Sequence, residues 1–89
     1  MTKKKIVLFA SGRGSNAEAI HDAVVEGMIN GEIMALVCDI PGAGCIDLAK
    51  SWDIPVIVAD RKQFDSKDAF EQFILDAIAP YEADLLCLA

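Results

Sequence analysis

The sequence IVLFASGRGSNA at residues 6–17 decides the fold of this chain. The apolar run at residues 6–10 predicts a buried strand. Two glycines follow it and indicate a tight turn. A helical pattern begins directly after the turn, and we expect Ser15 or Asn16 to cap that helix. The stretch therefore predicts a strand, a glycine-containing turn and a helix in direct succession.

This strand–turn–helix unit predicts a phosphate-binding loop. The first N–H groups of the helix lack partners inside it, and the helix dipole adds positive potential there. Gly12 and Gly14 have no Cβ to hold a phosphate away from the main chain. Ser15 and Asn16 offer side-chain hydrogen bonds, and Arg13 offers positive charge. The alternative is a plain tight turn in which the glycines serve only geometry and Arg13 is solvated.

Outward from this stretch, short apolar runs alternate with helical patterns. Strands are predicted at residues 5–10, 32–38, 56–58 and 85–89, and helices at 16–26, 45–52 and about 65–79. The order β-α-β-α-β-α-β is typical of an α/β fold with a parallel sheet, flanking helices and right-handed crossovers. Ligands of such sheets bind beyond the carboxyl ends of the strands. That edge carries the glycine turn, Asp39, the loop at 59–64 and Ala89.

Each predicted helix has one apolar face at helical spacing, which predicts the core. Asp65 or Ser66 is expected to cap the third helix, and Pro80 to end it. His21 falls outside the apolar face of the first helix, so we expect an exposed histidine with neither a nucleophile nor a metal as partner. The expected core residues of the three helices are Ala17, Ile20, Val24, Gly27 and Met28, then Cys45, Leu48, Ala49 and Trp52, then Phe70, Phe73, Ile74, Ala77 and Ile78.

Composition narrows the class of protein. A chain of 89 residues allows one small domain, and 54% hydrophobic residues predict a packed core. The net charge of −6, without a basic stripe, argues against a nucleic-acid partner, and no apolar run has the length of a membrane span. The basic start at residues 1–5 leads into a run too short for a signal peptide, which predicts a cytoplasmic protein.

The three cysteines, Cys38, Cys45 and Cys87, are odd in number and widely spaced. This pattern argues against a disulfide framework and against a zinc site, so no metal is expected. We expect each cysteine to behave as a small buried hydrophobe in a reducing compartment.

The glycine turn also fits a loose dinucleotide fingerprint, Gly12-x-Gly14-x-x-Ala17. In that interpretation Asp39 is the carboxylate that binds a ribose. The competing interpretation of Asp39, which turn propensity favours, is a turn-forming residue before a Pro-Gly loop. A nucleotide P-loop is excluded because no Gly-Lys-Ser/Thr follows.

The residues of the glycine turn resemble the N-terminus of the phosphoribosylglycinamide formyltransferase family. The similarity rests on the motif Ser-Gly-x-Gly-Ser-Asn at residues 11–16, and similar segments continue through Ile54-Pro55, the segment at 64–67 and the segment at 81–89. The resemblance implies a Rossmann-like fold, of which residues 1–89 form the N-terminal half. It also implies transfer of a formyl group from 10-formyltetrahydrofolate to glycinamide ribonucleotide in purine synthesis.

By the same resemblance, Gly14, Ser15 and Asn16 hold the substrate phosphate, with Gly12 and Arg13 as further candidates. Lys67 matches a basic residue on the folate side, where the family commonly has Arg. A lysine keeps the charge but loses the planar fork, and a solvated helix-start lysine is an equal alternative. Asp39 stands where the family often has Asn.

The family's catalytic Asn, His and Asp lie beyond residue 89, and His21 does not match the catalytic histidine. The resemblance therefore predicts a formyltransferase domain truncated after the strand at 85–89, with no catalytic residue and no turnover of its own. A non-catalytic half domain that binds a phosphorylated metabolite or a dinucleotide is the alternative. The strand at 85–89 is apolar on both faces, so we expect it to self-associate or to dock the C-terminal half of such a domain.

Overall fold

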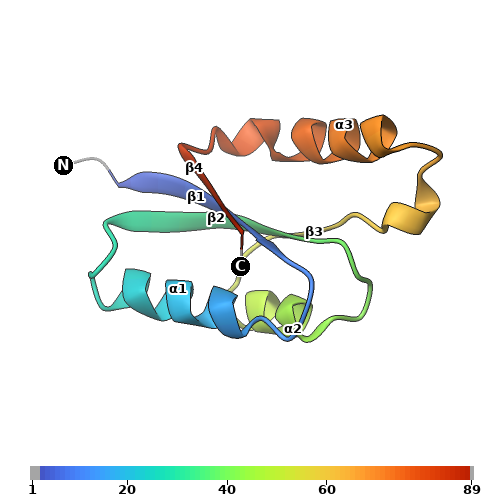
Figure 1. The fold of residues 1–89 in the computed structure, drawn as a ribbon. Coiled ribbons are helices and arrows are strands. Elements are labelled where there is room, and N and C mark those ends of the chain that lie inside the picture. Colours follow the sequence, from blue (N-terminus) through green and yellow to red (C-terminus); the bar gives the residue numbers. More distant parts are fainter. Residues whose placement is uncertain (1–2, 89) are drawn as a thin grey trace.

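The computed structural model describes residues 3–88 and contains one sheet of four parallel strands (Figure 1). The strands are β1 (Lys4–Ala10), β2 (Gly31–Cys38), β3 (Val56–Val58) and β4 (Leu85–Leu88), in the order β3-β2-β1-β4. Every neighbouring pair is parallel, which confirms the predicted α/β fold. Strand order reverses between β1 and β4, because β2 and β3 lie on one side of β1 and β4 on the other. Ala89 lies outside the described residues.

Three helices connect the strands. Helices α1 (Ser15–Val25) and α2 (Gly44–Ser51) cover one face of the sheet, and α3 (Lys67–Ile78) lies across the other (Figure 1). Two short 3-10 helices add to the predicted pattern, η1 (Arg61–Gln63) within the expected loop at 59–64 and η2 (Ala79–Tyr81) after α3. Pro80 lacks an N–H group, so it ends the α-helical ladder, but the backbone winds on for one tighter turn.

The α1/α2 face of the sheet is closely packed. Ile6, Leu8 and Ala10 of β1 point to it at the alternating spacing of a strand. Ile46 belongs to the same core, although the predicted apolar face of its helix did not include it. The buried residues of this cluster are Ile6, Leu8, Ala10, Ala17, Leu36, Cys38, Cys45, Ile46 and Ala49.

The α3 face is packed more loosely. Its buried cluster comprises only Val7, Val37 and Ile78 among the described residues. Phe9 and Ile74 are partly buried against that cluster. Phe73, predicted as core, is 42% exposed and is not part of this cluster; its ring contacts Phe64, with ring centroids 5.2 Å apart.

Strand β4 forms one edge of the sheet, since β1 is its only hydrogen-bonded neighbour within residues 3–88. Leu85 is 46% exposed and Leu86 50% exposed. Leu86 pairs with Val7 and therefore points to the α3 face, whereas Leu85 pairs with Ile6 and points to the α1/α2 face. The edge strand thus leaves apolar surface open on both faces.

Three predictions for the first helix and its end are wrong. Met28, which is 76% exposed, and Gly27, which is also exposed, are not core residues, because α1 ends at Val25 and Gly27, at φ +81°, turns the chain away. His21 is not a free surface histidine, since its ring stacks on Trp52 with centroids 3.9 Å apart. Only 23% of the His21 side chain is exposed, and its Nδ1 atom is buried without a hydrogen bond. The neighbouring positions of α1 and α2 on one face explain this contact.

The cysteines lie mainly in the core of the α1/α2 face. Cys38 and Cys45 are fully buried and Cys87 is partly buried, all as free thiols. The Cys45 thiol donates to the Cys38 sulfur at 3.5 Å, and the Cys38 thiol donates to the Ile40 carbonyl oxygen at 3.2 Å. Within the part of the chain that the structure describes, no helix is long and apolar enough to cross a bilayer.

Candidate functional site

The glycine turn leads from the carboxyl end of β1 into α1. Ser11, Gly12 and Arg13 are exposed, whereas Gly14 is buried and stands at the N-cap position of α1. Gly14 has φ 87° and ψ 18°, a left-handed conformation that favours glycine. The expectation that Ser15 or Asn16 caps the helix is wrong: the chain enters α1 through this glycine, and the cap position makes no side-chain hydrogen bond.

The conformation of Gly14 is tied to the packing of α2. A Cβ on Gly14 would lie 2.9 Å from Cys45 Cβ and 2.9 Å from Leu48 Cδ1, closer than such atoms approach in proteins. A Cβ on Gly12 would meet no atom within 4 Å. Gly14 therefore allows α1 and α2 to approach closely, whereas Gly12 borders open space beside the turn.

The start of α2 also holds the turn through its backbone. The Cys45 N–H donates to the Gly12 carbonyl oxygen at 3.1 Å. A Cβ on Gly44 would lie 3.3 Å from the Arg13 carbonyl oxygen, so the two backbones run close together here. This contact uses the amide of Cys45, the second residue of α2, and fixes the glycine turn against the start of that helix.

The start of α1 presents unsatisfied donors. The first helical bond runs from the Glu18 N–H to the Gly14 carbonyl oxygen at 2.7 Å. Among the described residues, the N–H groups of Ser15, Asn16 and Ala17 have no acceptor. The side chains of Ser15 and Asn16 are exposed beside them. Ala17 is fully buried, so the amides of the exposed residues Ser15 and Asn16, at the positive end of the helix dipole, are the ones that can bind an anion.

The other predicted binding residue, Lys67, lies at the same edge of the sheet but on the opposite face. It is the first residue of α3, whose start lies at the carboxyl edge above the sheet, while α1 starts below it (Figure 1). Its Nζ atom lies 3.8 Å from Glu71 Oε1, one helical turn along, and 71% of the side chain is exposed. An exposed pair of this kind is worth little energy, so Lys67 is free to exchange partners.

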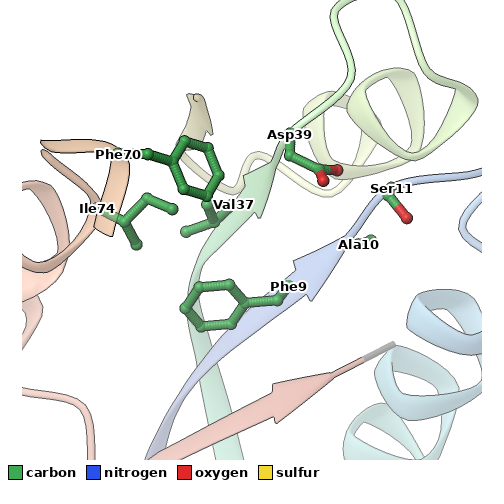
Figure 2. A pocket seen from close by; sticks show the side chains of 7 residues that line it. All are labelled: Phe9, Ala10, Ser11, Val37, Asp39, Phe70 and Ile74. Carbon is green, nitrogen blue, oxygen red and sulfur yellow. The ribbon is translucent and has the colours of Figure 1, made fainter. Parts of the chain in front are cut away.

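Asp39 lies at the carboxyl end of β2, next to Ser11 at the end of β1 (Figure 2). Both line a cavity between the sheet and α3, with Phe9, Val37, Phe70 and Ile74 forming its apolar part. The sequence did not reveal this cavity, because its apolar residues were interpreted as packed core. Within residues 3–88 no group of three or more His, Cys, Asp or Glu side chains is arranged to hold a metal ion.

Comparison with known proteins identifies relatives of the whole chain. The formyl transferase family model matches residues 4–89. Phosphoribosylglycinamide formyltransferase from Bacillus subtilis is 40% identical over 86 residues, which cover 97% of this chain and 44% of that protein. The chloroplastic phosphoribosylglycinamide formyltransferase of Arabidopsis thaliana is 32% identical over 98% of this chain and 30% of that protein.

Solved structures agree with these relatives. Glycinamide ribonucleotide transformylase 1 from Geobacillus kaustophilus superposes with a TM-score of 0.92 at 38% identity, covering 98% of this chain and 46% of that one. Phosphoribosylglycinamide formyltransferase from Brucella melitensis gives a TM-score of 0.92 at 37% identity, covering 98% and 45%. The chain thus spans less than half the length of these relatives.

Proposed function

We propose, from the premise that this chain belongs to the formyl transferase family, that residues 1–89 are the N-terminal, substrate-phosphate-binding portion of a phosphoribosylglycinamide formyltransferase domain. The reaction proposed for the whole domain is transfer of a formyl group from 10-formyltetrahydrofolate to the amine of glycinamide ribonucleotide, in purine biosynthesis. The names of the relatives from Bacillus subtilis and Geobacillus kaustophilus support this assignment.

The observation that carries the proposal is the pair of unpaired amides on the exposed residues Ser15 and Asn16 at the start of α1. The phosphate of the ribonucleotide accepts hydrogen bonds from these two N–H groups. The exposed side chains of Ser15 and Asn16 add donors, and Arg13 adds positive charge. Gly14 fixes the direction in which the amides point, and Gly12 leaves the approach open.

The folate side of the proposed domain involves Lys67. Its ammonium group exchanges its weak pairing with Glu71 for a carboxylate of the formyl donor. General acid–base catalysis of the transfer needs a group within hydrogen-bond reach of the reacting amine. We assign none of residues 3–88 to that role, since His21 is stacked against Trp52 in the packed α1/α2 layer.

The edge of β4 is the proposed contact with the remainder of the domain. Its unpaired side and the half-exposed Leu85 and Leu86 favour a further strand there, or a second copy of this chain when no other partner is present. Sedimentation velocity of Leu86→Lys against the parent chain tests this proposal. We expect the variant to shift toward monomer, and equal self-association of both chains would contradict the proposed contact.

Isothermal titration calorimetry with glycinamide ribonucleotide tests the phosphate site. We expect Ser15→Ala and Asn16→Ala each to weaken binding by roughly threefold to tenfold, the loss of one neutral or charge-assisted hydrogen bond. Asn30→Ala, an exposed change in the connection between α1 and β2, serves as the control. Unchanged affinity in both loop variants would remove the loop from the site.

The dinucleotide alternative is tested in the same way. It requires that NAD binds with Asp39 holding a ribose diol. The proposed function predicts no saturable NAD signal and no effect of Asp39→Asn on ribonucleotide binding. Tight NAD binding that Asp39→Asn abolishes would favour the alternative.

A further inference from the structure

A cavity of about 330 Å³ opens between α3 and the carboxyl ends of β1 and β2, on the face of the sheet opposite α1 (Figure 2). Its volume is in the range of small-molecule sites. Phe9 and Val37 project from the sheet, and Phe70 and Ile74 project toward them from α3 (Figure 2). Two side chains from the strands and two from α3 thus form the apolar wall of the cavity, and one of each pair is aromatic.

The polar groups of the cavity gather at one end. Asp39 and Ser11 lie beyond the ends of their strands, at the mouth of the cavity (Figure 2). Neither the Asp39 carboxylate nor the Ser11 hydroxyl makes a hydrogen bond or ion pair with any residue from 3 to 88. No lysine or arginine lines the cavity, although the Arg61 guanidinium lies 5.9 Å from the Phe70 ring centroid outside it.

This arrangement selects the chemistry of a ligand. Aromatic and branched aliphatic walls favour a flat ring, which stacks on or meets the edge of the phenylalanine rings. The free carboxylate favours N–H donors and positive charge, and it repels a phosphate or carboxylate. The cavity therefore favours a ligand of positive charge, whereas the start of α1 favours an anion.

We propose that this cavity is a second binding site, which takes a planar ring bearing amino or amidino groups, with the ring between Phe9 and Phe70 and its N–H groups on the Asp39 carboxylate. The Ser11 hydroxyl accepts or donates one further hydrogen bond. The site is independent of the phosphate loop, because it uses the other face of the sheet and the other sign of charge.

Benzamidine is the probe, and benzoate is its matched control, since the two share a flat ring and differ in the sign of the charge. Titration followed by two-dimensional NMR is expected to give saturable benzamidine shifts at Ser11, Val37 and Phe70. Benzoate is expected to give none there. Asp39→Asn, at an exposed position that tolerates an amide, is expected to weaken benzamidine roughly tenfold or more, whereas Glu32→Gln on the same strand leaves it unchanged.

Three outcomes would overturn the proposal. Equal binding of benzamidine and benzoate would show that the carboxylate does not select the ligand. Unchanged benzamidine affinity in Asp39→Asn would have the same meaning. NMR shifts at Phe9 and Phe70 that grow with protein concentration in the absence of benzamidine, together with a dimer in sedimentation, would show that the cavity is a contact between copies of the chain.

Discussion

The two faces of the sheet differ in how completely they are covered. On the α1/α2 face, side chains from β1, β2 and both helices form one buried cluster that extends to the glycine turn. On the α3 face, the buried cluster comprises only Val7, Val37 and Ile78 among the described residues, and a cavity remains at the carboxyl edge. One helix spans the face that β3, β2, β1 and β4 present to it, whereas two helices cover the opposite face.

This difference separates two kinds of site. The start of α1 is held rigidly, because Gly14 packs on Cys45 and Leu48 and the Gly12 carbonyl accepts from the Cys45 amide. Its binding groups are main-chain amides in a fixed geometry. The α3 face instead has a cavity, and its binding groups are the side chains of loosely packed residues. Rigid amides suit a phosphate, and an open apolar pocket suits a ring.

The largest expected difference between the faces concerns two matched leucine truncations. Leu36 is fully buried on the α1/α2 face, and Leu86 is 50% exposed on the α3 face. We expect Leu36→Ala to lower the free energy of unfolding by about 2–5 kcal/mol. Leu86→Ala should lower it by about 1 kcal/mol, because half of the leucine surface is already in water. Urea denaturation of both variants checks this, and equal losses would show that the two faces are packed alike.

A smaller effect is expected from alanine at the two glycines of the turn. Gly14→Ala should cost about 1–3 kcal/mol of stability, because φ is positive there and the new Cβ meets Cys45 and Leu48. It should also weaken phosphate binding by tilting the start of α1. Gly12→Ala should change stability by less than about 0.5 kcal/mol, since its Cβ meets open space. Thermal unfolding compares the two, and a neutral Gly14→Ala would contradict the packing of the turn on α2.

The buried thiols predict a pH dependence that belongs to the α1/α2 face. Burial, followed by the hydrogen bond with Cys38, raises the pKa of the Cys45 thiol from 9.0 to about 11. The folded state therefore keeps this proton between pH 9 and 11 while the unfolded state loses it. The free energy of unfolding is thus expected to fall by up to about 1.4 kcal/mol per pH unit in that window, with the full contribution present at lower pH.

Cys45→Ala should remove this decrease in the free energy of unfolding between pH 9 and 11, because the titrating thiol is gone. Cys87→Ala, which changes a partly buried thiol on the edge strand, is the control and should leave the slope in place. Urea denaturation under reducing conditions from pH 8 to 11 measures it. The same slope in both variants would show that burial of Cys45 does not hold its proton.

The smallest expected effect lies at the start of α3. The Ser66 side chain accepts from the Ala69 N–H at 3.1 Å and so caps this helix. Ser66→Ala should cost about 1 kcal/mol. It should leave phosphate binding at α1 unchanged, because the two helices start on opposite faces. A loss of phosphate affinity in this variant would show that the two faces are coupled.

Much of the fold was predictable because local signals agreed with the tertiary structure. Short apolar runs between helical patterns predicted all four strands. The sequence predicted Asp65 or Ser66 as the cap of the third helix, and the structure shows that it is Ser66. The apolar face of α1 was extended too far, to Met28, although Gly27 is the kind of residue that ends a helix. The prediction followed the apolar periodicity and did not take into account that Gly27 favours the end of a helix.

The parts that escaped prediction depend on contacts between elements. The stack of His21 on Trp52 arises because α1 and α2 lie side by side, which no spacing within either helix reveals. The left-handed cap at Gly14 is imposed by α2 in the same way. The cavity could not be predicted either, since Phe9 and Phe70 carry the same apolar signal whether the space between them is filled or empty.

The central claim is that the amides at the start of α1 bind the phosphate of a ribonucleotide. An NMR titration of the ¹⁵N-labelled chain with ribose 5-phosphate tests it most directly, because each amide reports separately. We expect saturable shifts at Ser15 and Asn16, and none at Val37 or Phe70 on the α3 face. Saturable shifts confined to other residues, or no saturable shift at these two α1 amides, would contradict the claim.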